Sequence, residues 1–259
     1  MKLSFLEITK LSKFFGGLAA VTGLDISVDR GLIFGLIGPN GAGKSTVLNM
    51  IGGTLHPSQG EIFFNGKKVT RLPPHTRAGD GIGRVFQENL LFTNFTVLQN
   101  VLVGYHLQIP IGLASIFRKT SSNRSQEETL LKKALDTLEF VGLLEYSDEM
   151  AINLPHGRQR LLCLAVALAA QPQLLLLDEP VTGMNAEEVE GMAAMIKALR
   201  GKKGITCIVV EHNMRAVMGL CDRIAVLNFG RKIAEGSPRA IVEDKAVIEA
   251  YLGAEEDVA

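Results

Sequence analysis

The sequence predicts an α/β core that is interrupted by a helical subdomain. Three largely apolar runs of strand length, at residues 31–38, 174–178 and 205–211, are typical of strands buried on both faces. A helical stretch at residues 185–200 separates the last two runs, and leucines recur at helical spacing over residues 126–145. We therefore expect one domain over residues 1–259, with its core in residues 1–87 and 171–259 and its helical subdomain in residues 88–170.

The first third of the chain predicts an antiparallel β subdomain. Residues 6–12 and 24–29 alternate between apolar and polar side chains, as half-buried strands do. Residues 60–69 contain two strand-like pieces around Asn65 and Gly66, the dipeptide that type I′ hairpin turns favour.

The end of the chain predicts a second hairpin followed by a helix. Residues 222–236 are expected to form the hairpin and to turn at residues 228–230. Ser237 is then the expected N-cap of a helix, with Pro238 at its first position.

The composition limits the classes of function. The chain has a hydrophobic content of 47% and a formal net charge of +0, with 27 basic and 27 acidic residues. Because clustered Lys and Arg hold nucleic-acid backbones, this balance argues against nucleic acid as the main ligand. The three cysteines, Cys163, Cys207 and Cys221, lie in apolar or helical surroundings and predict buried thiols in a reducing compartment.

Neither a signal peptide nor a membrane span is expected. Polar residues punctuate the N-terminal segment, which excludes the apolar centre of a signal peptide. The longest apolar stretch, residues 161–170, is shorter than the roughly 20 residues that cross a bilayer. Any role at a membrane is therefore expected to depend on a partner.

Residues 38–45 carry the pattern G-x-x-x-x-G-K-S between a predicted strand and a predicted helix, the context that a phosphate-binding loop requires. Its glycines let backbone N–H groups turn toward phosphate oxygens, and the helix directs its positive end to the same place. Lys44 is expected to pair with the β- and γ-phosphates, and the Ser45 hydroxyl to ligate Mg²⁺. The expected nucleotide-binding loop is Gly38, Pro39, Asn40, Gly41, Ala42, Gly43, Lys44, Ser45 and Thr46.

The apolar run at residues 174–178 ends in Asp178, and Glu179 follows directly. After a phosphate-binding loop, we expect Asp178 to hold the Mg²⁺ shell. Glu179 is expected to orient or activate the water that attacks the γ-phosphate.

With these motifs the chain resembles the ATP-binding subunits of ABC transporters over nearly its whole length. In that family Gln87 of "RVFQ" matches the Q-loop glutamine, a further Mg²⁺ and catalytic residue. His212 of "VVEHN" matches the histidine that reaches the γ-phosphate, and Phe15 matches the aromatic residue that stacks on adenine. The resemblance implies a P-loop NTPase fold with a RecA-like core, and ATP with Mg²⁺ as cofactors. Asn185 stands where the family more often has Asp.

The family signature Leu-Ser-Gly-Gly-Gln is altered in this chain. In two-ATP dimers this segment binds the γ-phosphate held by the other subunit. Here Pro155 replaces the serine, which removes a hydroxyl and a backbone N–H, while His156 and Arg158 add donors. Two interpretations stay open: a weakened half-site, or a proline that only starts the next helix. The aligned residues are Leu154, Pro155, His156, Gly157 and Arg158.

Details such as "FGGLAAV", "GMNAEE" and "VIEAYLGAE" resemble the G-type ATP-binding subunit of branched-chain amino acid importers. That subgroup implies two permease subunits, a second and unlike ATPase, and a periplasmic solute-binding protein. It also implies a peripheral place on the cytoplasmic face of the inner membrane. Related subunits are assigned to urea, amides and aromatic acids, so the solute stays open. In the helical subdomain, "IPIGLASIF" is either core packing or a contact with a membrane subunit.

Two alternatives belong to other classes of function. An ABC ATPase that drives export or lipid extraction would carry similar motifs. A soluble ABC protein acting on ribosomes or DNA would more often carry two ATPase units, coiled-coil inserts or basic patches, and the sequence displays none of these.

Overall fold

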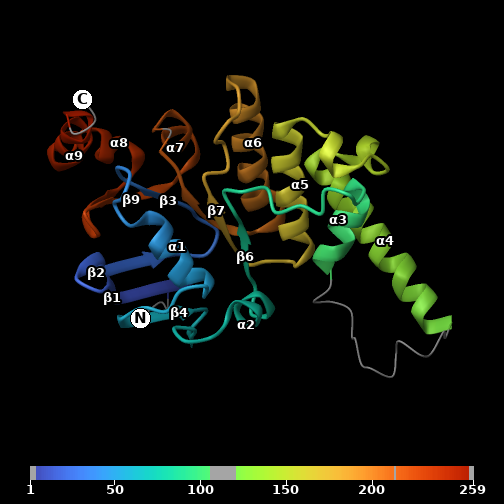
Figure 1. Cartoon of the computed structure of the whole chain (residues 1–259), viewed down its shortest axis with the longest axis horizontal. Coiled ribbons are helices and arrows are strands. Elements are labelled where there is room, and N and C mark those ends of the chain that lie inside the picture. Colours follow the sequence, from blue (N-terminus) through green and yellow to red (C-terminus); the bar gives the residue numbers. More distant parts are fainter. Residues whose placement is uncertain (1–3, 106–120, 213, 257–259) are drawn as a thin grey trace. The chain divides into compact units, whose positions relative to one another are not determined.

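The computed structural model describes residues 4–105, 121–212 and 214–256. The chain divides into two compact units (Figure 1). Unit 1 comprises Met1–Gln87, Gln173–Thr182 and Ala186–Ala259, and unit 2 comprises Glu88–Pro172 and Gly183–Asn185. The segment "IPIGLASIF", for which core packing or a contact with a membrane subunit was expected, lies outside the described residues.

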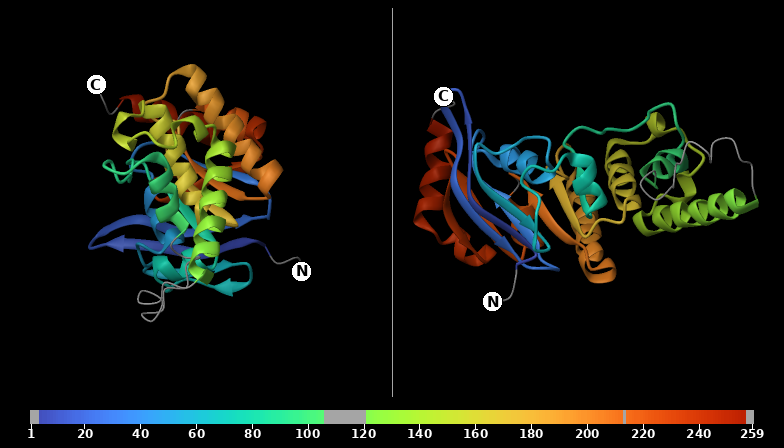
Figure 2. Two further views of the ribbon diagram at one scale, coloured as in Figure 1. Left: turned by 90° about the vertical axis from the view of Figure 1, so that its right-hand side faces the viewer. Right: turned by 90° about the horizontal axis from the view of Figure 1, so that it is seen from below.

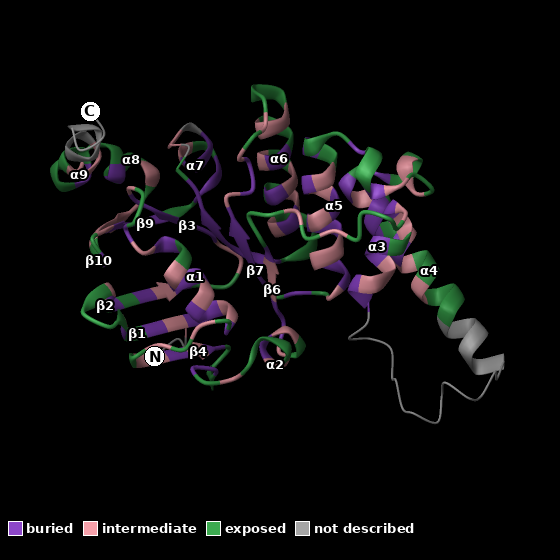
Figure 3. Ribbon diagram, viewed as in Figure 1, coloured by how far each residue is buried: buried purple, intermediate pink, exposed green. Residues whose placement is uncertain are grey.

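A six-stranded sheet forms the centre of unit 1. All neighbouring pairs in it are parallel, except the hairpin of β9 and β10 at one edge. Strands β3, β8 and β7 are buried at every position, which explains why they are continuous apolar runs in the sequence (Figure 3). The spatial order is β10 (Arg231–Gly236), β9 (Arg223–Asn228), β3 (Ile33–Ile37), β8 (Thr206–Val210), β7 (Leu174–Asp178) and β6 (Ile82–Val85).

A second, antiparallel sheet in unit 1 confirms the strands expected in the first third of the chain. It has the order β2 (Leu18–Val28), β1 (Leu6–Phe15), β4 (Gln59–Phe64) and β5 (Lys67–Lys68). Phe64 pairs with Lys67, so Asn65 and Gly66 form the two-residue hairpin loop that the sequence predicts.

The helices of unit 1 are α1 (Lys44–Gly52), α2 (Pro74–Gly79), α6 (Ala186–Lys203), α7 (Met214–Leu220), α8 (Pro238–Val242) and α9 (Lys245–Glu256). The expected Ser237 N-cap is present, because its hydroxyl accepts from the Ala240 N–H. Helices α8 and α9, red in Figure 2, pack against β10. No helix in the described ranges is long and apolar enough to cross a membrane.

A buried arginine donates hydrogen bonds to carbonyl groups at the C-terminal end of α1. Arg77 of α2 donates to the carbonyl oxygens of Met50 and Ile51, and to those of Thr70 and Leu72. Burial lowers the pKa of the Arg77 guanidinium to about 10. Its hydrogen bonds therefore satisfy carbonyls at a helix end that have no intrahelical partner.

Unit 2 is helical, but its first helix begins later than the sequence suggests. Helix α3 starts at Val97, although the expected helical subdomain begins at residue 88. Thr96 and Gln99 form a capping box that fixes this start. The preceding loop is held by Asn100, whose side chain bonds the backbone of Phe92 and other loop carbonyls. The elements are α3 (Val97–Gly104), α4 (Ser121–Val141), η2 (Leu144–Tyr146), η3 (Ala151–Asn153) and α5 (His156–Ala169).

The cysteines are free thiols, as expected. Cys207 and Cys221 are buried, whereas Cys163 is half-buried. Burial raises the pKa of all three thiols, to about 12 for Cys207 and Cys221 and about 11 for Cys163.

Candidate active site

The carboxyl ends of four neighbouring parallel strands carry the predicted site residues of unit 1 other than Phe15, which ends β1 of the antiparallel sheet. The phosphate-binding loop follows β3, His212 follows β8, Asp178 ends β7, and Gln87 follows β6. In open α/β sheets this edge is where ligands bind. A pocket of about 660 Å³ opens here, lined by loop residues together with Glu179 and an apolar group at one end.

Two glycines of the loop have backbones that other residues could not adopt here. Gly38 has a φ of 147°, and a Cβ on it would lie 2.0 Å from the carbonyl oxygen of Leu227. Gly43 has a φ of 101°, and its Cβ would lie 2.5 Å from the carbonyl oxygen of Ala20. As the N-cap of α1, Gly43 offers no side-chain acceptor, so the first N–H groups of this helix have no capping side chain.

Lys44 is already held in place. Its Nζ donates to the carbonyl oxygens of Gly38 and Pro39, each at 2.8 Å. Burial lowers the pKa of the ammonium, and the nearby carboxylates of Glu179 and Asp178 act in the opposite direction. A largely buried cation at the start of a helix is an environment that attracts phosphate.

Three side chains lie against the Glu179 carboxylate. Its Oε2 accepts from the Gln87 amide at 2.9 Å and from the Thr182 hydroxyl at 3.1 Å, and its Oε1 lies 3.7 Å from His212 Nδ1. Its φ of 49° is uncommon for a residue with a side chain, and such strain clusters at functional sites. The structure thus brings Gln87, Glu179 and His212 together.

Arg84 of β6 is a neighbour of Asp178 that the sequence did not suggest. Its Nη2 donates to Asp178 Oδ2 at 2.8 Å, and its Nη1 donates to the side chain of Asn49 at 2.7 Å. The guanidinium also lies 4.5 Å from the ring centre of Phe86. Arg84 therefore fixes the orientation of Asp178 relative to α1.

The residues expected to ligate Mg²⁺ belong to the same edge of the sheet. Ser45, Gln87 and Asp178 offer a hydroxyl, an amide oxygen and a carboxylate, a set of hard oxygen donors that suits this ion. Asp178 Oδ2 accepts from Arg84, and the carboxylate would still offer oxygen lone pairs to a cation. The donor chemistry of the described residues fits Mg²⁺.

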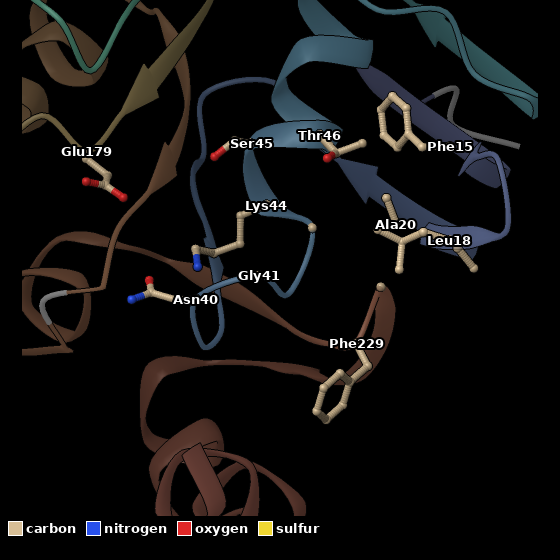
Figure 4. Close-up of a pocket in the computed structure, with 13 residues that line it drawn as sticks. Phe15, Leu18, Ala20, Asn40, Gly41, Lys44, Ser45, Thr46, Glu179 and Phe229 are labelled. Carbon is tan, nitrogen blue, oxygen red and sulfur yellow. The ribbon is translucent and has the colours of Figure 1, made fainter. Parts of the chain in front are cut away.

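The other end of the pocket is apolar. In Figure 4, Phe15, Leu18, Ala20 and Phe229 lie toward one side of the pocket, and Glu179 and Asn40 lie toward the other. Lys13 Nζ lies 5.0 Å from the ring centre of Phe15. Phe229, at the turn between β9 and β10, is a lining residue that sequence reasoning missed, and its only local signal is an aromatic residue before a turn glycine.

The signature segment belongs to unit 2. Leu154 is buried, and Pro155 is the N-cap of α5 without a side-chain hydrogen bond to the helix. The His156 ring lies close to Gly183, where a Cβ would be 3.1 Å from Cε1. Arg158 stacks on Tyr146, with 4.1 Å between the guanidinium carbon and the ring centre. Gly157 is buried within the first turn of α5.

Comparison with known proteins assigns the family. The family model described as ABC transporter matches residues 21–182, which is more than half of the chain. The chain belongs to the ABC transporter family. A second model, described as branched-chain amino acid ATP-binding cassette transporter, matches residues 231–257 of this ABC protein.

The full length has relatives and structural neighbours in the same family. The cassette is 40% identical to the high-affinity branched-chain amino acid transport ATP-binding protein LivG of Escherichia coli, over 98% of the chain and 99% of LivG. It is 38% identical to BraF of Pseudomonas aeruginosa, which has the same description, with the same coverage. The lipopolysaccharide export system ATP-binding protein LptB of Haemophilus influenzae is 32% identical, over 97% of the chain and 98% of LptB.

The fold agrees with solved cassettes. A nucleotide-free ATP-binding cassette from an ABC transporter superposes with a TM-score of 0.84 at 32% identity, covering 95% of this chain and 98% of the other. The expected fold class, an ABC-type P-loop NTPase with β and helical parts, is therefore confirmed, and the protein is an ATP-binding ATPase of this family.

Proposed function

We propose that this ABC ATPase powers the import of branched-chain amino acids or a related small solute. Residues 231–257 support this assignment, because they match a model specific to branched-chain amino acid cassettes. The near full-length likeness to LivG and BraF supports it further. The cassette would act with two permease subunits, a second and unlike ATPase, and a periplasmic solute-binding protein. Its place would be peripheral, on the cytoplasmic face of the inner membrane.

ATP lies in the pocket with its phosphates on the loop of residues 38–46. The Lys44 ammonium, held between two loop carbonyls, moves to the β- and γ-phosphates when they arrive. Ser45, Asp178 and Gln87 would hold Mg²⁺, which would neutralise phosphate charge. Phe15 stacks on the adenine ring.

Glu179 orients the attacking water. The hydrogen bonds from Gln87 and Thr182 fix its carboxylate before the nucleotide binds, which is the preorganisation that catalysis requires. His212, beside the same carboxylate, reaches the γ-phosphate. This held carboxylate, next to the loop and Lys44, is the observation in the structure that best supports hydrolysis at this site.

The test is transport in proteoliposomes that contain the complete set of subunits. Lys44→Ala should abolish ATP binding by isothermal calorimetry. Glu179→Gln should retain binding but lose at least about 100-fold in ATP turnover, and uptake of leucine should stop. The matched control is Glu249→Gln, the same exchange at an exposed position of α9.

Two results would contradict the proposal. Full turnover by Glu179→Gln would remove the catalytic role of this carboxylate. ATP-driven extraction of lipid, without uptake of any amino acid, would favour the second candidate function, for which the likeness to LptB is the supporting observation.

A further inference from the structure

Two hairpins of this chain have the same type of turn but different residues at its first position. Asn65–Gly66 joins β4 to β5 and has φ values of 50° and 77°. Phe229–Gly230 joins β9 to β10 and has φ values of 45° and 73°. Positive φ at both central residues defines the type I′ turn, which favours Asn at its first position.

Phe229 is therefore a poor choice for the turn itself. A bulky side chain at positive φ is strained, whereas Asn tolerates this conformation. The ring gains no burial in return, since 83% of Phe229 is exposed. Neither the turn conformation nor packing within unit 1 therefore accounts for an aromatic side chain at this position.

The turn is fixed to the nucleotide pocket by its glycine. The Gly230 N–H donates to the carbonyl oxygen of Ala42 in the phosphate-binding loop at 3.1 Å. The Gly230 carbonyl accepts from the Thr22 N–H of β2 at 2.8 Å. A Cβ on Gly230 would lie 2.6 Å from the carbonyl oxygen of Ala20, so only glycine permits this approach. The position of Phe229 is thus coupled to the loop.

Phe229 lines the pocket at the same end as Phe15 and Leu18 (Figure 4). This end is apolar and lies away from Glu179, where a nucleotide with its phosphates at Lys44 would place its adenosine part. On one face of Phe15, Lys13 lies 5.0 Å from the ring centre, so the other face is the one available for stacking. A second aromatic ring at this end offers the adenosine part another π surface.

We infer that Phe229 is a second aromatic contact for the adenosine part of ATP, across the pocket entrance from Phe15. This inference rests on the proposed binding of ATP along residues 38–46. An exposed ring at a fixed turn can adjust its side-chain torsions to cover the base or ribose without moving the backbone. The strained turn would then be retained because it holds an aromatic residue beside the nucleotide.

The test is Phe229→Asn in the full chain, which gives the turn its preferred residue and removes the ring. We expect thermal stability to be unchanged or higher. The Kd for ATP should rise by about 5-fold to 100-fold, the range that one base–aromatic contact supplies. The Kd for inorganic tripolyphosphate, which has no adenosine, should stay within about twofold of the wild type.

Two further variants separate the ring from the turn. Phe229→Tyr restores a ring and should recover most of the ATP affinity. Asn65→Phe makes the reverse exchange in the other hairpin, and should lower the melting temperature while leaving the Kd for ATP unchanged.

The possible failures are distinct. If the wild type binds ATP and Lys44→Ala does not, but Phe229→Asn binds ATP as tightly as the wild type, the role of Phe229 is overturned and the proposed site stands. An equal loss of ATP and tripolyphosphate affinity in Phe229→Asn would also overturn it, because the turn would then act through the loop. If the wild type binds neither ligand, the proposed nucleotide site itself is wrong.

Discussion

The ion pair of Arg84 and Asp178 offers a sharp test of how this site is built. The two side chains are 10% and 8% exposed, so the pair is nearly closed to water. Substitution of Arg84 by Met keeps much of the side-chain volume but leaves the Asp178 carboxylate without its cationic partner. The pair of Arg200 and Asp222 is the matched control, because its side chains are 38% and 34% exposed.

The structure sets the expected magnitudes. Breaking a buried ion pair by removing one partner costs about 3–5 kcal/mol, because an uncompensated charge stays behind. Exposed pairs contribute about 0–1 kcal/mol. Arg84 also donates to Asn49, which adds to its loss, whereas the nearby Lys44 ammonium still attracts the Asp178 carboxylate and reduces it, so we expect a cost within this buried range. We therefore expect Arg84→Met to lower the free energy of unfolding several times more than Arg200→Met does.

Urea unfolding followed by circular dichroism measures both variants, and a double-mutant cycle identifies the cause. If the unpaired charge dominates, adding Asp178→Asn to Arg84→Met should recover about 1–3 kcal/mol. If the loss comes only from packing, the second substitution recovers nothing. A double variant as unstable as the sum of both single variants would refute the reasoning, as would equal costs for Arg84→Met and Arg200→Met.

Two further predictions concern the loop and the pH dependence of stability. Gly43→Ala should abolish ATP binding because its Cβ would lie 2.5 Å from the Ala20 carbonyl oxygen, whereas Gly66→Ala, which has positive φ but nothing within 4 Å, should leave calorimetric binding unchanged. For Asp222, burial acts to raise the pKa, but hydrogen bonds from Arg200 and the Ile33 N–H prevail, so the pKa lies below its usual 3.8. Its carboxylate therefore stabilises the fold at neutral pH and loses that effect as the pH falls through the lowered pKa. The melting temperature of Asp222→Asn should be lower than that of the wild type at pH 7, and the two should converge below pH 3.8; a constant difference would contradict this.

Continuous local patterns explain what the sequence predicted well. Apolar runs predicted the buried strands, and the turn glycines Gly66 and Gly230 indicated the two hairpins. Because the carboxyl ends of parallel strands lie at the same edge of the sheet, motifs that directly follow such strands are expected to lie close together. The gathering of Gln87, Glu179 and His212 follows from this topology, although they lie far apart in the sequence.

The features that escaped prediction depend on distant partners or on short elements. Arg84 and Asp178 are 94 positions apart in the sequence, and no local sequence pattern predicts that they pair. Helices α2 and α7 have only 6 and 7 residues, too few for a periodic signal. The sequence placed Phe229 in the turn at residues 228–230, but no local pattern indicated that its side chain lines the nucleotide pocket.

If the cassette pairs with a second, unlike ATPase, as proposed above, its altered signature would affect how turnover is divided between the two composite ATP sites. In such a pair, one composite site joins the loop of this chain to the signature of the partner, and the other joins the partner's loop to the segment that contains Pro155. The structure shows that Pro155 leaves α5 without a side-chain cap and that Arg158 is stacked on Tyr146. Of the substitute donors, His156 therefore remains the better placed, at the first position of α5.

Pro155→Ser tests whether this segment limits turnover. A serine here would cap α5, adding about 0.5–2 kcal/mol of stability, and would restore a hydroxyl and an N–H at the start of this helix. One missing oxyanion donor can cost about 2.7–4 kcal/mol in rate. If the sites are unequal, Pro155→Ser should raise ATP turnover of the reconstituted transporter, and Glu179→Gln should stop transport more completely than the same change in the partner. A more stable Pro155→Ser variant with unchanged turnover, together with equal losses from both glutamate variants, would mean that Pro155 only begins a helix.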